Sequence, residues 1–209
     1  MRRDARRIFA VAAAAAIVAA GVAGARAVAG PPAPPGLQTR GGGSSAAHAG
    51  SFERFALYWL GDSFEGLPLA AVTRRTDARV DGESVRADFV GFVYGDCVAR
   101  DESGCAPPLE VQVWPACERT LADYTLTPSA DPLPHEPTIV RGVPAAYFEE
   151  GLRLELYAGD VTIVVFGLDR TRIQRAAAAL RAANALAGHG PMLPRPVPGA
   201  IEGELTCSG

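Results

Sequence analysis

The sequence predicts an α+β domain in which an antiparallel β-sheet is covered by one long C-terminal helix. From residue 51 onward, short apolar runs are bounded by Gly, Pro and Asp, a pattern typical of strands and turns. Near the C-terminus, an Ala-rich stretch carries apolar residues at helical spacing. Together these patterns predict one compact domain over residues 51–188.

The first 27 residues have the pattern of an export signal. A basic start precedes the apolar stretch 8–25, and Ala25-Arg26-Ala27 fits the small-x-small cleavage pattern. Segment 1–27 is therefore predicted to be a signal peptide, with a mature chain that begins near Val28. An uncleaved membrane anchor is the alternative, because 18 apolar residues behind four arginines are just long enough to span a bilayer. Both interpretations predict an extracytoplasmic domain, secreted or anchored to the cell membrane.

Residues 28–50 are predicted to be a tether. This segment is rich first in Pro and then in Gly and Ser, and it has too little apolar surface to form a packed core.

Seven strands are predicted along the domain. The clearest unit is a hairpin in which residues 152–158 alternate apolar and polar, Gly159-Asp160 form the turn, and residues 161–167 are apolar apart from Thr162. A fully apolar strand is expected in the centre of a sheet, with both faces covered. The predicted strands are 54–60, 68–74, 87–94, 109–114, 143–149, 152–158 and 161–167.

One long helix is predicted over residues 169–188. Either Asp169 or Thr171 can cap its N-terminus, and Gly188 is expected at its C-terminal end. Small Ala side chains would let the helix approach the sheet closely. The apolar stripe is expected to contain Ile173, Ala177, Leu180 and Ala187. Residues 127–137 and the tail 189–209 are rich in proline and are predicted to be irregular.

Four cysteines in an exported chain predict two disulfides. Cys97 ends one predicted strand and Cys105 precedes the next, so both lie at one end of a hairpin and are expected to pair. Cys117 lies past the other end of the second strand, about 20 Å away at roughly 3.3 Å per residue. It therefore needs a distant partner, and Cys207 is predicted to fill that role and to hold the tail. Four thiolates around zinc are the alternative, but no two cysteines have the two-to-four-residue spacing of such sites.

Composition excludes several classes of function. All 20 basic residues are arginine, so neither a lysine Schiff base nor a phosphate-loop lysine is present. Residues 51–209 contain 14 Arg and 22 acidic residues, a net charge of −8. This charge disfavours nucleic acid and anionic lipid as partners, so membrane contact is expected only through an uncleaved N-terminal segment. No cofactor is predicted.

Gly61-Asp62-Ser63 resembles the tripeptide that carries the nucleophile of GDSL-type serine esterases. That resemblance also implies an Asn-bearing oxyanion block and a late Asp-x-x-His. The only Asn is Asn184, inside the predicted helix, and His135 has Asp131 four residues before it instead of three. A serine nucleophile needs both a base and an oxyanion site, so Ser63 with His135 is the weaker hypothesis.

A tight turn is the favoured interpretation of the same stretch. Gly66 is free to take positive φ, and Pro68 can open the next strand.

Two further groups of residues have side chains that could form a site. Asp96, Asp101 and Glu102 could bind a cation, but a solvated acidic loop is favoured because calcium needs six or more oxygen ligands. No metal site is therefore predicted. The aromatic residues are expected to be mostly core, although Trp59 and Trp114 could line a ligand groove.

Several motifs together resemble small exported or membrane-anchored proteins of actinobacteria: LGDSFEGLPL, VYGDC, GCAPPLEVQVWPAC, RGVPAA and LELYAGDVTIVVFG. The resemblance covers about residues 55–207 and implies an extracytoplasmic domain without implying an activity. The predicted function is a non-catalytic binding or structural domain at the cell envelope, with an envelope partner or a small ligand. The alternative is a serine hydrolase that uses Ser63.

Overall fold

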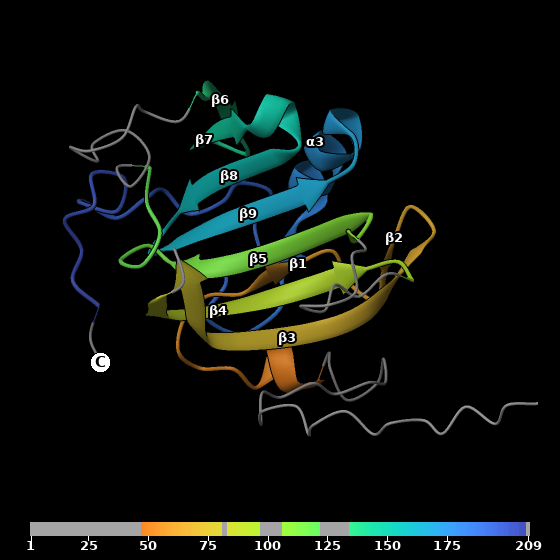
Figure 1. Cartoon of the computed structure of the whole chain (residues 1–209), viewed down its shortest axis with the longest axis horizontal. Helices are drawn as coiled ribbons and strands as arrows, with labels where there is room; N and C mark the ends of the chain where they lie inside the picture. Colours follow the sequence, from red (N-terminus) through yellow and green to blue (C-terminus); the bar gives the residue numbers. More distant parts are fainter. Residues whose placement is uncertain (1–46, 81–82, 97–105, 122–133, 208–209) are drawn as a thin grey trace, which may run out of the picture. The chain divides into compact units, whose positions relative to one another are not determined.

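The computed structural model describes residues 47–80, 83–96, 106–121 and 134–207. Eight strands form one antiparallel sheet in the order β2-β3-β4-β5-β9-β8-β7-β6 (Figure 1). The sheet consists of two four-strand meanders that meet where β5 pairs with β9. The predicted antiparallel sheet is therefore confirmed. Its strands are β2 (Ser63–Phe64), β3 (Leu67–Val80), β4 (Glu83–Tyr94), β5 (Leu109–Pro115), β6 (Glu136–Val140), β7 (Val143–Phe148), β8 (Arg153–Ala158) and β9 (Val161–Gly167).

Strand β9 lies in the middle of the sheet, between β5 and β8, as its apolar sequence predicts. Its residues Ile163, Val164 and Val165 are completely buried although their side chains alternate between the two faces. The predicted turn at Gly159-Asp160 joins β8 to β9, and Gly159 has a φ of 58°.

Helix α3 (Arg170–Ala179) packs on one face of the sheet, over β8 and β9. Asp169 caps it by accepting hydrogen bonds from Thr171 N at 3.0 Å and Arg172 N at 3.3 Å. A Cβ atom at Gly167 would lie 3.0 Å from Ile173 Cγ1, so this glycine permits the close approach of helix and sheet. The core side chains on this face of the sheet include Phe92, Val111, Leu154, Leu156 and Ile163.

Arginines of α3 also reach two flanking hairpins. Arg170 pairs with Glu136 of β6 at 2.6 Å, and Arg175 pairs with Glu65 in the β2–β3 turn. These pairs are exposed or partly exposed, so each contributes little to stability, but they link the helix to both outer strands of the sheet.

The helix is half as long as predicted, and the predicted C-cap at Gly188 is wrong. After Leu180 the chain becomes extended, and β10 (Arg181–Ala182) pairs with β1 (Tyr58–Trp59). The buried Asn184 side chain accepts from Leu57 N and donates to the carbonyls of Phe52 and Phe55. These tertiary hydrogen bonds outweigh the helix propensity of the Ala-rich sequence.

Short strands were the main errors in the predicted sheet. The predicted strand 54–60 is reduced to β1, which does not belong to the eight-strand sheet. The two outer strands β2 and β6 were not predicted, because β2 has two residues and β6 begins with Glu-Pro at the end of a proline-rich segment.

Within the described ranges, no helix combines the length and the apolar character needed to cross a membrane. The predicted signal or anchor, 1–27, and the tether up to residue 46 lie outside those ranges; residues 47–50 form one helical turn.

Candidate functional site

Ser63 lies in a tight surface hairpin. It pairs with Pro68 of β3, and its side chain is exposed. Glu65 and Gly66 form the two-residue turn with φ values of 47° and 79°, as in a type I′ turn. This geometry confirms the turn interpretation of the sequence.

His135 lies next to the opposite edge of the sheet. It precedes β6, and its ring stacks on Phe148 with centroids 5.7 Å apart. Because β2 and β6 are the two outer strands, Ser63 and His135 lie at opposite edges of the sheet. The structure does not bring the two residues together. Asn184 is occupied by the three backbone groups described above, so it offers no oxyanion donor to Ser63.

Trp59 and Trp114 lie on opposite faces of the sheet. Trp59 packs near Phe92 on the core face, with ring centroids 6.0 Å apart. Trp114 stacks on Phe89 with centroids 4.0 Å apart, and Phe89 and Phe92 point to opposite faces because they are three residues apart on β4. The two tryptophans therefore do not line one groove.

The face of the sheet opposite α3 carries a buried ion-pair network. Glu155 is completely buried, and its Oε1 lies 2.5 Å from Arg119 Nη2 and 3.3 Å from Arg153 Nε. Arg153 also pairs with Glu149 at 2.9 Å. Two guanidinium groups balance the negative charge of the buried carboxylate. Through the Arg119–Glu155 pair, the network joins β8 to the segment that follows β5.

A second polar row runs along β5 on the same face. Gln112 donates to Glu110 Oε1 at 2.9 Å and accepts from Trp114 Nε1 at 3.0 Å. Burial raises the pKa of Glu110 above its ordinary value of 4.5. These side chains form hydrogen bonds with one another, so the row is better explained by sheet packing than by ligand binding.

No cluster of three or more potential metal-ligating side chains occurs among the residues that the structure describes. Of the three acidic residues in the possible cation site, Asp96 is exposed, and Asp101 and Glu102 lie outside the described ranges.

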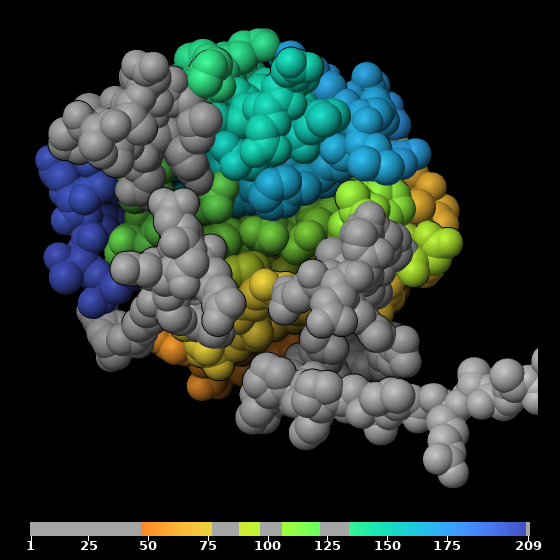
Figure 2. Space-filling view, in the orientation of Figure 1, coloured from red at the N-terminus to blue at the C-terminus, as the bar shows by residue number. Residues whose placement is uncertain are grey.

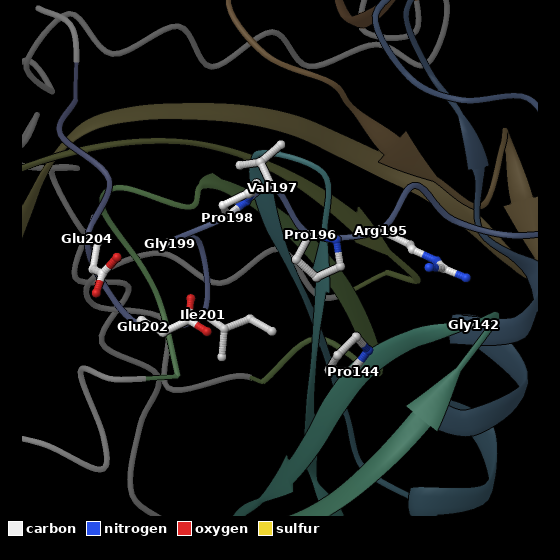
Figure 3. A pocket seen from close by; sticks show the side chains of 10 residues that line it. All are labelled: Gly142, Pro144, Arg195, Pro196, Val197, Pro198, Gly199, Ile201, Glu202 and Glu204. Atoms are coloured by element: carbon white, nitrogen blue, oxygen red, sulfur yellow. The ribbon is translucent and has the colours of Figure 1, made fainter.

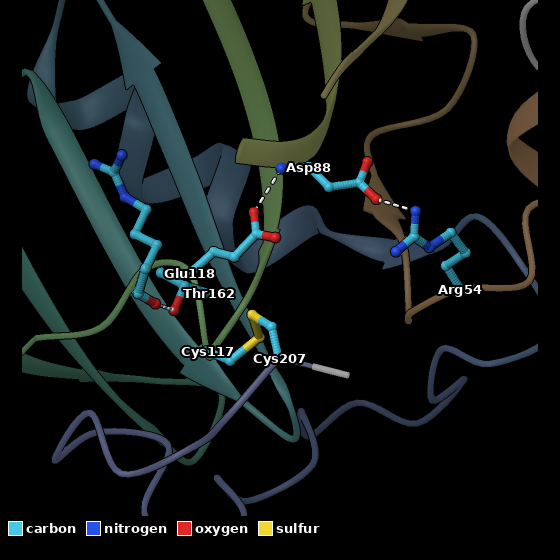
Figure 4. The surroundings of a disulfide bond; sticks show 7 residues. Arg54, Asp88, Cys117, Glu118, Thr162 and Cys207 are labelled. Atoms are coloured by element: carbon cyan, nitrogen blue, oxygen red, sulfur yellow. Dashed lines mark hydrogen bonds and ion pairs between the residues drawn. A yellow bond between two sulfur atoms is a disulfide. The ribbon is translucent and has the colours of Figure 1, made fainter. Parts of the chain in front are cut away.

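The C-terminal tail is fastened by a disulfide. Cys117 and Cys207 are bonded, with Cα atoms 5.3 Å apart, so this predicted pair is confirmed (Figure 4). Cys97 and Cys105 lie outside the described residues. The segment that carries Cys117 is itself anchored, because Glu118 accepts from Asp88 N at 2.5 Å and Thr162 Oγ1 donates to the Arg119 carbonyl at 2.6 Å.

Arg141 anchors the start of the tail from the β6–β7 turn. Its half-buried guanidinium donates to the carbonyls of Leu180, Gly190 and Pro191, the last two at 2.8 and 2.7 Å. Desolvation by burial lowers the pKa of Arg141 from its ordinary value. In return, the backbone carbonyl of Arg141 accepts from Leu193 N at 3.0 Å.

The β8–β9 turn holds the next part of the tail. Gly159 N donates to the Pro194 carbonyl at 3.0 Å, and the Gly159 carbonyl accepts from Val197 N at 2.9 Å. In Figure 2 the tail lies along one side of the molecule in dark blue, next to the green end of β5. The tail is therefore an ordered wall, although its sequence predicts no regular element.

A groove of about 650 Å³ opens between this wall and the start of β7. Its volume is within the usual range for ligand sites. Figure 3 shows carboxylates on one side of the apolar residues and the Arg195 guanidinium on the other. The tail groove, as we call it, is lined by Gly142, Pro144, Arg195, Pro196, Val197, Pro198, Gly199, Ile201, Glu202 and Glu204.

Exposed apolar side chains gather around the tail groove. Val197 lines it with 38% of its surface exposed, and Ile139, 76% exposed, pairs with the lining residue Pro144. Met192 is 58% exposed and lies against Gly142. Large exposed apolar side chains that cluster are typical of surfaces that bind a partner.

Sequence reasoning missed the residues of the tail groove. Its prolines predict only irregular structure. Arg141 lies in a short turn, and no local pattern in the sequence indicates its contacts with the tail. The one available signal was Cys207, which implied that the tail returns to the domain.

Comparison of the chain with family models, curated proteins and solved structures gives no match.

Proposed function

We propose that this chain is a non-catalytic binding or structural domain at the cell envelope, and that the tail groove holds its partner or small ligand. The observation that carries the proposal is that a proline-rich tail, held by a disulfide and by Arg141, forms one wall of an apolar groove. A wall fixed before binding lowers the entropy cost of binding.

The extracytoplasmic part of the proposal is supported by the N-terminal sequence and by the disulfide. The basic and apolar pattern of residues 1–27 is typical of export, and disulfides persist in oxidising compartments. The non-catalytic part is supported by the positions of Ser63 and His135 at opposite edges of the sheet.

The test is a titration of the exported, disulfide-intact protein, labelled with 15N, with separated fractions of the host envelope: wall polymer, glycolipid and soluble envelope protein. We expect one fraction to shift the amide signals of residues 195–204 and Gly142. Val197→Arg should remove that response because it places a charge in the groove.

The matched control is Leu168→Arg, since Leu168 is 63% exposed and does not line the groove. This variant should respond like the unaltered protein. Shifts confined to another surface, or no shift with any fraction, would contradict the proposal.

A further inference from the structure

We propose that the tail groove binds an extended peptide segment that has apolar residues in its middle, a basic group at one end and a carboxylate at the other. This inference rests on the proposed function, because it names the class of ligand for the same groove.

The middle of the groove offers apolar surface and no side-chain amide or hydroxyl. Pro144, Pro196 and Pro198 contribute rigid rings, and Val197 and Ile201 contribute branched aliphatic groups. Among the described lining residues, the only polar side chains are the charged groups of Arg195, Glu202 and Glu204. The lining therefore suits aliphatic or proline side chains of a peptide.

Two glycines in the lining are required by the local backbone conformation and by close neighbours. Gly142 and Gly199 have φ values of 81° and 84°, which other residues adopt only with strain. A Cβ atom at Gly142 would clash with Met192 Cε, and a Cβ atom at Gly199 would lie 3.1 Å from Glu204 Cβ, so these glycines let Met192 and Glu204 pack against the main chain at the groove.

Charge gives the ligand a direction. Glu202 and Glu204 lie on one side of the apolar residues and Arg195 on the other (Figure 3). None of these three side chains forms an ion pair with another described residue. A basic group next to the two carboxylates and a carboxylate next to Arg195 would complement this pattern.

The experiment uses a display library of random octapeptides, selected on the full-length, disulfide-intact protein at low salt. Enriched peptides should carry Lys or Arg at one end, Asp or Glu at the other, and Val, Leu, Ile or Pro between them. Their affinity should fall about three- to tenfold in the double variant Glu202→Gln/Glu204→Gln, as expected for exposed charge pairs. Added salt should lower their affinity for the unaltered protein more than their affinity for the double variant.

The control double variant is Glu53→Gln/Asp96→Asn, which removes two exposed acids outside the groove and should bind as the unaltered protein does. Peptides that lose binding with Val197→Arg but show no charge pattern would overturn this inference and leave the proposed function standing. Peptides that bind Val197→Arg unchanged, or a library that yields no binder, would contradict both.

Discussion

Cys117 and Cys207 are separated by 90 residues in the sequence, and their disulfide joins the segment after β5 to the end of the tail. The tail is also held by main-chain hydrogen bonds to the Arg141 carbonyl and Gly159, by the Arg141 side chain, and by Leu193, which is buried in the hydrophobic core. Two of these attachments, the disulfide and the Arg141 side chain, can be removed separately by substitution.

Cys207→Ala should lower the free energy of unfolding by about 4 to 5 kcal/mol, the chain-entropy value for a loop of this length. It should also speed amide hydrogen exchange in residues 195–204, because this segment is attached at one end by the hydrogen bonds to Gly159 and at the other end by the disulfide that the variant lacks. Denaturant unfolding and hydrogen exchange measure the two effects. A tail that stays fully protected in this variant would show that the disulfide does not maintain the groove.

Arg141→Leu should destabilise the protein by about 2 to 4 kcal/mol, because three carbonyls lose a charged donor. Arg195→Leu is the matched control. Its side chain is exposed and forms no described ion pair, so its effect should stay within about 0.5 kcal/mol. Equal effects of the two substitutions in urea unfolding would contradict the role of Arg141.

Glu155→Leu should destabilise the protein by about 3 to 5 kcal/mol, because it leaves Arg119 and Arg153 without their shared carboxylate. The exposed Glu204→Leu should have little effect on stability. Denaturant midpoints of the two variants make the comparison, and a neutral Glu155→Leu would mean that the network does not stabilise the fold.

Glu110→Gln should stabilise the protein at pH 7. Burial raises the pKa of Glu110 in the folded state, so the folded protein binds this proton more tightly than the unfolded chain, and stability is lost as pH rises through the folded-state pKa. The amide of the Glu110→Gln variant does not ionise, so the variant does not lose stability as pH rises. Its advantage should disappear below the ordinary pKa of 4.5, where both states of the natural residue are protonated.

Glu136→Gln should show the opposite pH dependence. The Arg170 hydrogen bond lowers the pKa of Glu136, so the natural residue contributes stability at neutral pH that is lost as pH falls through the folded-state pKa. Unfolding curves of both variants at pH 7 and pH 3.5 measure the sign of the change in the free energy of unfolding for each substitution. The same sign for both variants would contradict the assigned environments.

Ser63→Ala should leave both stability and function unchanged. Ser63 is exposed in a turn, so the effect on unfolding should be within about 0.5 kcal/mol. The unaltered protein should not react with a serine-directed fluorophosphonate. Labelling that disappears in Ser63→Ala would establish the hydrolase alternative and contradict the non-catalytic proposal.

Local patterns were enough to predict most of the sheet. The alternation in 152–158 and the apolar run 161–167 identified the β8–β9 hairpin and the central position of β9. The Cys117–Cys207 pair followed from the length of β5, because a strand separates its two ends by a fixed distance.

The remaining features depend on contacts distant in sequence. Asn184 ends the helical region by bonding to backbone groups more than 120 residues away, which no local propensity reveals. The tail groove exists because Arg141, Gly159 and Cys117 hold one irregular segment, and irregular backbone has no periodic pattern to detect.

The most direct test of the binding proposal is photo-cross-linking in the living host, with a benzophenone amino acid placed at Val197 or at Leu168. Both positions are exposed and apolar, but only Val197 lines the tail groove. We expect a discrete adduct at Val197 that is lost when Cys207→Ala is added, and no such adduct at Leu168. Equal cross-linking at the two positions, or an adduct at Val197 that survives Cys207→Ala unchanged, would contradict the assignment of the tail groove as the binding site.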